Sequence, residues 1–141
     1  MSSDQTSCPC GLSGTVESCC GRYIFDGLPA PAPDLLMRSR YCAFTLGTPK
    51  AVDYLVETHH KDFRQPNLHA ALKATVLDVT WMSLEIREAS QEGNEGIVEF
   101  VATYKHDDCA YQLQERSSFL REDGRWYYTT GELDPAQNGP L

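Results

Sequence analysis

Residues 97–131 read IVEFVATYKHDDCAYQLQERSSFLREDGRWYYTTG and contain the clearest signals for the fold. Runs rich in β-branched and aromatic residues alternate here with short polar turns, which is typical of strands joined by hairpins. The Asp123-Gly124 pair is a strong signal for a two-residue hairpin turn. The segment therefore predicts antiparallel strands over residues 97–104, 110–121 and 125–131.

One more strand is expected before this segment. Residues 76–86 alternate imperfectly between apolar and polar side chains, so we expect a strand with a bulge near Met82 and Ser83. The Gly-Asn-Glu-Gly run at residues 93–96 predicts the turn into the next strand.

Helix signals precede the strands. Asp34 is the expected N-cap of the first helix, which stops at Gly47, and Thr48 is the expected N-cap of the second. The predicted helices cover residues 34–46, 48–58 and 66–74. Helices followed by consecutive hairpins predict an α+β fold in which N-terminal helices pack on a curved antiparallel sheet.

A cysteine cluster near the N-terminus points to a metal. The spacing is C-x-C, then eight residues, then C-C, formed by Cys8, Cys10, Cys19 and Cys20. Thiolates are the ligands that zinc takes in closed structural sites. Gly11 and Gly21 follow the two pairs, and we expect positive φ angles there that turn backbone N–H groups toward the sulfurs. The sequence therefore predicts Zn²⁺ as the cofactor.

Disulfides and redox-active thiols are the alternatives to zinc. Residues 1–20 lack the basic start and the apolar run of about seven to fifteen residues that a secretion signal needs. We therefore expect a cytoplasmic protein with reduced thiols. No apolar stretch approaches the roughly twenty residues that span a bilayer, so no membrane association is expected.

The charge balance bears on partners. The chain has 12 basic and 20 acidic residues, for a formal net charge of −8. Proteins that bind nucleic acid usually carry a basic patch or stripe, and no basic run occurs in this sequence. Nucleic acid is therefore not expected as the main partner.

Two resemblances extend this interpretation. Residues 8–21 resemble the SEC-C motif, a small zinc knuckle. Beyond it the chain resembles the YchJ-like family in the sequence segments LMRSRY (36–41), DYLVETHH (53–60), VEFVA (98–102) and GRWYY (124–128), and in Gly131. That family implies a cone-like domain similar to nuclear transport factor 2, with a pocket between sheet and helices and no assigned biochemical role.

The resulting domain organisation has four parts. The alternation of Pro and Ala in residues 27–33 favours a stiff connector, and the prolines and polar residues of 134–141 favour fraying. The parts are a SEC-C zinc knuckle (1–26), a Pro/Ala linker (27–33), a nuclear transport factor 2-like α+β domain (34–133) and a flexible tail (134–141).

The third strand carries the main candidate for chemistry. Glu115 shares its face with apolar residues, and a buried carboxylate must be paired or protonated. Arg38, on an apolar helical stripe, is the expected partner; the pair either fastens helix to sheet or supplies a general base. The candidate pocket residues are Arg38, Tyr41, Trp81, Glu115, Ser117, Trp126 and Tyr128. His59 and His60 either bind metal or complement the dipole of the preceding helix.

Three functional hypotheses follow. The leading one is a zinc-dependent adaptor that holds a protein partner without turnover. The second is a small-molecule enzyme or carrier that uses Glu115, Arg38 and Tyr41. The third is a purely structural knuckle. No P-loop, dinucleotide fingerprint, H-E-x-x-H or nucleophile elbow occurs in the sequence, so the interpretation leans away from an enzyme. Homodimerisation through the open sheet face is compatible with all three.

Overall fold

The computed structural model of the chain describes residues 8–12, 14–133 and 139–140. The helices come first along the chain: α1 (Gly21–Ile24), α2 (Pro33–Leu46), α3 (Pro49–Glu57), the 3₁₀ turn η1 (Lys61–Phe63) and α4 (Leu68–Asp78). The strands follow: β1 (Thr80–Glu92), β2 (Glu95–His106), β3 (Cys109–Glu122), β4 (Arg125–Leu133) and the short β5 (Gly139–Pro140).

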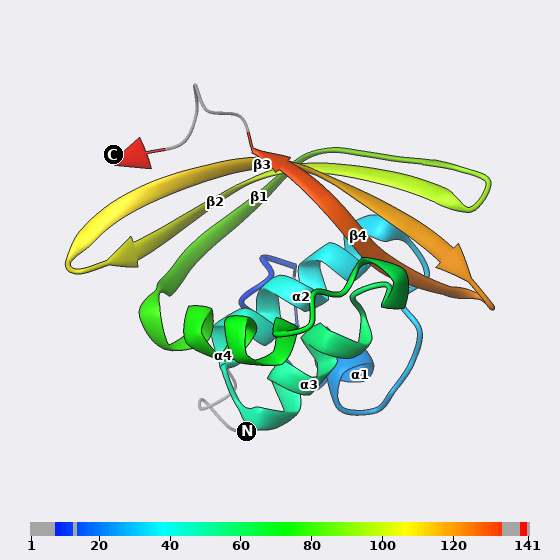
Figure 1. Cartoon of the computed structure of the whole chain (residues 1–141), viewed down its shortest axis with the longest axis horizontal. Coiled ribbons are helices and arrows are strands. Elements are labelled where there is room, and N and C mark those ends of the chain that lie inside the picture. The colour runs from blue at the N-terminus through cyan, green and yellow to red at the C-terminus, as the bar shows by residue number, and fades with distance from the viewer. Residues whose placement is uncertain (1–7, 13, 134–138, 141) are drawn as a thin grey trace.

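The strands form an antiparallel sheet in the order β1-β2-β3-β4. The helices lie together on one face of this twisted sheet (Figure 1). This arrangement confirms the predicted α+β fold. The predicted flexible tail lies mostly outside the described residues, but Gly139 pairs with Gln112 of β3 beyond the end of β4.

Local sequence signals explain most of the helix ends. Thr48 caps α3 by accepting a hydrogen bond from the Ala51 backbone N–H at 3.2 Å, as predicted. Gly47 ends α2 with a φ of 65°, in the left-handed region that favours glycine. The predicted cap at Asp34 is wrong: the N-cap is Ala32, and Asp34 lies in the first turn, where its charge complements the helix dipole.

The predicted boundary between the third helix and the first strand is also wrong. Helix α4 extends to Asp78, so residues 76–78 are helical rather than extended. Val76 packs so closely on Gly47 that a Cβ there would collide with its Cγ1, and this contact holds the last turn of α4 against the end of α2. The predicted bulge is confirmed, because the β1–β2 register shifts between Trp81 and Ser83.

The core lies between the helices and the sheet. Its largest fully buried side chains include Leu36 of α2, Leu55 of α3, Val98 of β2 and Phe119 of β3. The four N-terminal cysteines belong to the same buried cluster. The cysteine-rich segment is therefore packed into the main core against α2.

Candidate metal centre and ligand pocket

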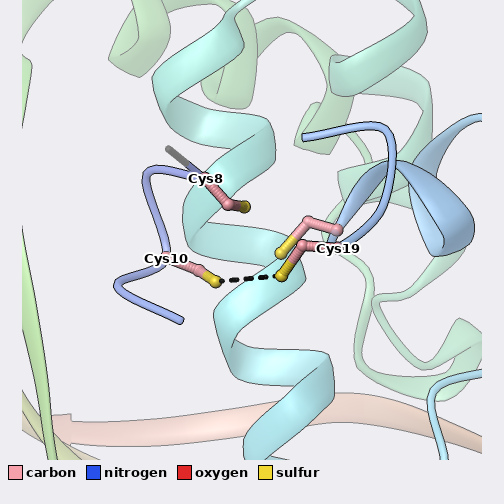
Figure 2. Close-up of side chains that lie close together, drawn as sticks. Cys8, Cys10 and Cys19 are labelled. Atoms are coloured by element: carbon pink, nitrogen blue, oxygen red, sulfur yellow. Dashed lines mark hydrogen bonds between the residues drawn. The ribbon is translucent and has the colours of Figure 1, made fainter. Parts of the chain in front are cut away.

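The four cysteine sulfurs converge on one point. All four Sγ atoms lie within 4.8 Å of one another, and those of Cys10 and Cys19 are 3.6 Å apart (Figure 2). A tetrahedral zinc site with bonds of about 2.3 Å has sulfur–sulfur edges of about 3.8 Å. None of the four side chains is more than 4% exposed. The donor set and its burial fit a closed structural metal site.

Two short turns build this cluster. The Cys8 N–H donates to the Gly14 carbonyl at 2.9 Å, and the Gly11 N–H donates to the Cys8 carbonyl at 3.2 Å. Gly11 has a φ of 95°, which confirms the expected left-handed turn. The same expectation for Gly21 is wrong, because Gly21 begins α1. It must be glycine because its N–H lies 2.6 Å from the Val16 carbonyl, where a Cβ would collide.

Crowding of the thiols makes a cation favourable. The hydrogen bond with Cys20, followed by burial, raises the pKa of Cys10. Burial likewise raises the pKa of Cys8. Several thiolates cannot share a buried site without an opposing charge, whereas a bound divalent cation stabilises them. The electrostatics of the cluster therefore match its geometry.

Helix α2 holds the cysteine cluster in place (Figure 2). The Arg38 guanidinium donates from Nη1 to the Cys10 carbonyl at 2.6 Å. The Sγ of the fully buried Cys42, one turn further along α2, lies 3.9 Å from that of Cys8. The segment is thus docked, and the predicted pairing of Arg38 with Glu115 is wrong.

A separate pocket of about 280 Å³ lies on the sheet side of α2. Elements α2 and α4 and the inner face of β1–β3 enclose it. Apolar side chains make up most of its lining: Met37, Phe44, Leu68, Leu72, Trp81, Leu84, Phe100, Ala102 and Leu113. Its polar residues are Arg40, Tyr41, His59, Thr75, Glu115 and Tyr128.

Arg40, rather than the predicted Arg38, is the charged donor of this pocket. It is 4% exposed, and its Nη1 donates to the Leu55 carbonyl at 2.8 Å and to Thr58 Oγ1 at 2.6 Å. Its guanidinium lies 4.8 Å from the centroid of the Tyr128 ring. Burial lowers the pKa of Arg40 to about 10, which leaves it charged at neutral pH.

Glu115 is the charged acceptor of the pocket. Its Oε2 accepts from Ser117 Oγ at 2.7 Å and from the Tyr128 hydroxyl at 3.5 Å. A Cβ at Gly131, on neighbouring β4, would occupy the position of this carboxylate. Glycine at this position thus leaves room for the carboxylate, and Ser117 and Tyr128 orient it.

The other predicted pocket residues divide into two groups. Tyr41 and Trp81 line the pocket and pack edge to face, with ring centroids 5.9 Å apart. Trp81 Nε1 is buried and has no hydrogen-bond partner within the described part of the chain. Trp126 is also buried, but it lines a smaller hollow of about 180 Å³ that includes Tyr23 and Ile24 of α1.

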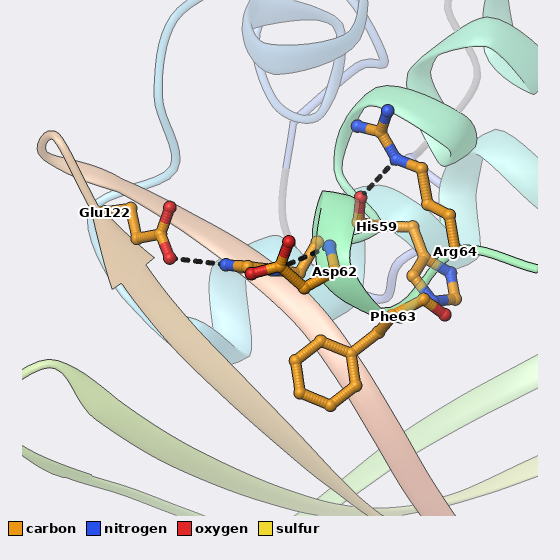
Figure 3. A network of polar contacts seen from close by, with 6 residues as sticks. His59, Asp62, Phe63, Arg64 and Glu122 are labelled. Atoms are coloured by element: carbon orange, nitrogen blue, oxygen red, sulfur yellow. Dashed lines mark hydrogen bonds and ion pairs between the residues drawn. The ribbon is translucent and has the colours of Figure 1, made fainter.

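The two histidines after α3 point to different partners and form no shared metal site. His60 is 2% exposed, and its Nε2 bonds to the Glu122 carboxylate while its ring Nδ1 accepts from the Asp62 N–H (Figure 3). His59 lines the pocket and donates from Nε2 to the Phe63 carbonyl at 3.1 Å. His60 thus fastens the turn after α3 to the end of β3.

His59 gives the protein a pH-dependent stability. Burial, reinforced by the charge of Arg40, lowers the pKa of His59 from 6.5 to about 4. Because the unfolded chain then binds more protons between these values, stability falls as the pH drops from about 6.5 to about 4. We expect the wild type to lose about 1–2 kcal/mol more than His59→Gln between pH 7 and 4, measured by urea unfolding. If the free energy of unfolding of the wild type and of His59→Gln changed equally with pH, this expectation would be contradicted.

Comparisons with known proteins agree with this architecture. The profile of the YchJ middle NTF2-like domain matches residues 32–131. The UPF0225 protein of Chromobacterium violaceum is 46% identical over 131 residues, which cover 90% of this chain and 93% of that protein. The chain belongs to the YchJ-like family.

Two solved structures resemble this YchJ-like protein. A SEC-C motif containing protein from Rhodopseudomonas palustris superposes with a TM-score of 0.80 at 33% identity, covering 90% of this chain and 98% of its own. A second, from Psychrobacter arcticus, has a TM-score of 0.73 at 24% identity, covering 96% and 85%, and supports the fold alone. Within the described residues, no helix combines the length and apolar character needed to cross a membrane.

Proposed function

We propose that this protein binds a small molecule in the pocket beneath α2, and that a zinc ion at the four cysteines serves to hold the N-terminal segment on the same helix. The observation that carries the proposal is a pocket of about 280 Å³ that contains both Arg40 and Glu115. Charged groups are rarely buried without a partner or a function.

The role given to zinc follows from the surroundings of the thiols. All four cysteines are buried. Four thiolate ligands would fill the tetrahedral coordination of zinc and leave no open position for a substrate, unlike in catalytic zinc sites. Arg38 and Cys42 of α2 contact the cysteine cluster. Arg40 and Tyr41 of the same helix line the pocket. The metal would therefore stabilise a wall of the pocket.

Filling the pocket tests the small-molecule proposal. Ala102 is 2% exposed and lines the pocket from β2, so Ala102→Phe should place its ring in open space and cost less than about 1.5 kcal/mol. Ala43 is 0% exposed on α2 and does not line the pocket, so Ala43→Phe should cost about 3 kcal/mol.

The same variant reports on binding. We expect naphthalene, a bare apolar probe, to bind the wild type in ligand-observed NMR and not to bind Ala102→Phe. If neither naphthalene nor its polar derivatives bind the wild type near their solubility limits, or if Ala102→Phe is as costly as Ala43→Phe, the pocket is not a binding site.

A zinc-dependent adaptor is the second candidate, favoured by exposed apolar residues next to α1. Phe25 is 47% exposed and Leu28 is 51% exposed, and both follow the second cysteine pair closely. Such side chains are common in protein interfaces. A specific protein contact that is lost in both Cys19→Ser and Phe25→Glu would support this role, and one retained in Cys19→Ser would oppose it.

A further inference from the structure

The pocket holds one buried cation, Arg40, and one half-buried carboxylate, Glu115, that do not pair directly. Arg40 and Glu115 influence each other electrostatically, yet no ion pair joins them among the contacts of the described residues. Arg40 uses Nη1 for its two hydrogen bonds, and within the described chain its Nε and Nη2 make none. On Glu115, Oε2 accepts the hydrogen bonds from both Ser117 and Tyr128. Each group therefore retains unused capacity inside the pocket.

The charge balance limits what can fill this gap. Arg40 and Glu115 together are neutral, and His59 is neutral at pH 7 because burial lowers its pKa to about 4. A ligand carboxylate would place two anions beside one guanidinium, and an ammonium group would place two cations beside one carboxylate. Either arrangement leaves one charge of the pocket uncompensated, which disfavours binding.

We propose that the ligand is an uncharged molecule with a flat apolar body and an amide-like group, whose oxygen accepts from Arg40 and whose N–H donates to Glu115. This inference rests on the small-molecule function proposed above and names its ligand class. A primary amide or lactam offers an acceptor and a donor side by side, so one group meets both charged residues without adding charge.

The rest of the lining indicates the apolar body. A cavity of roughly 150 Å³ lined by apolar side chains holds one benzene ring, and this pocket measures about 280 Å³. Space for a fused bicyclic ring is therefore present beside Phe44, Leu72 and Trp81.

Three probes with the same fused ring test the ligand class by calorimetry: 2-naphthamide, 2-naphthoate and unsubstituted naphthalene. We expect 2-naphthamide to bind the wild type at least ten-fold more tightly than either of the others. In ¹H–¹⁵N spectra, the indole resonance of Trp81 should shift, and that of Trp126, outside the pocket, should stay in place.

Glu115→Gln provides the decisive variant. The glutamine keeps the size of the side chain and an oxygen for Ser117, but it leaves Arg40 as the net charge of the pocket. The preference should then reverse, with 2-naphthoate at least ten-fold tighter than 2-naphthamide. Glu99→Gln is the matched control, because Glu99 lies on the other face of the sheet beside Arg116 and Gln114, and it should keep the wild-type order.

The possible failures are distinguishable. If naphthalene binds as tightly as 2-naphthamide, or if the wild type prefers 2-naphthoate, the ligand class is wrong while the pocket remains a binding site. If Glu115→Gln keeps the wild-type order, Glu115 does not contact the ligand and the inference is overturned. If none of the three probes binds the wild type, both this inference and the proposed function fail.

Discussion

Cys20→Ser is expected to lower the midpoint of thermal unfolding by about 15 °C, because it removes one of the four sulfurs that we propose hold a zinc ion. Cys20 is 1% exposed, and its sulfur belongs to the four-cysteine cluster that α2 supports. Loss of the metal leaves several buried thiols without an opposing charge and frees the N-terminal segment. A cost of about 4–5 kcal/mol corresponds to this shift for a domain of this size.

Cys109→Ser is the matched control for this experiment. Cys109 is exposed at the start of β3, away from the cluster, so its substitution should change stability by less than about 0.5 kcal/mol. Adding a chelator to the wild type should reproduce most of the effect of Cys20→Ser and leave the unfolding of that variant unchanged. A chelated wild type with an unchanged unfolding temperature would show that the cluster is stable without metal.

Arg40→Met is expected to cost about 3–5 kcal/mol in the free energy of unfolding. The substitution keeps an unbranched apolar stem but removes the guanidinium, which leaves the Leu55 carbonyl and the Thr58 hydroxyl without their donor. It also leaves Glu115 as an uncompensated charge in the pocket. Urea unfolding by circular dichroism measures the loss directly.

Two further variants separate these contributions. Arg38→Met removes one hydrogen bond to the Cys10 carbonyl from a partly buried side chain and should cost about 1 kcal/mol. Adding Glu115→Gln to Arg40→Met should recover about 1–2 kcal/mol, because the unpaired carboxylate is then gone. Equal costs for Arg38→Met and Arg40→Met would contradict the assignment of Arg40 to the pocket.

Much of the fold could be predicted because its signals are local. The turn at Asp123 and Gly124 has φ angles of 53° and 79°, as the sequence of this hairpin requires. Thr48 caps the helix that it precedes. The end of α4 could not be predicted in this way. Val76 and Leu77 are apolar and suit a strand as well as a helix, and the packing of Val76 on Gly47 decides between them.

The assignment of the pocket arginine failed for a related reason. Arg38 and Arg40 are two residues apart on α2, so they lie on nearly opposite sides of the helix. Helix α2 packs against the cysteine cluster, α3 and the sheet, so Arg38 donates to the Cys10 carbonyl while Arg40 donates to the Leu55 carbonyl of α3. The sequence does not show which neighbours cover each side of α2. The apolar stripe that contains Arg38 therefore suggested the wrong arginine for the pocket.

The most direct test of this account is a native mass spectrum of untagged wild-type protein, purified without chelator, beside the Cys19→Ser/Cys20→Ser double variant. We predict one zinc ion per chain in the wild type and none in the variant. The same spectrum reports dimers, and a retained molecule should have the mass of a small uncharged compound. A metal-free wild type with four reduced thiols would contradict the account.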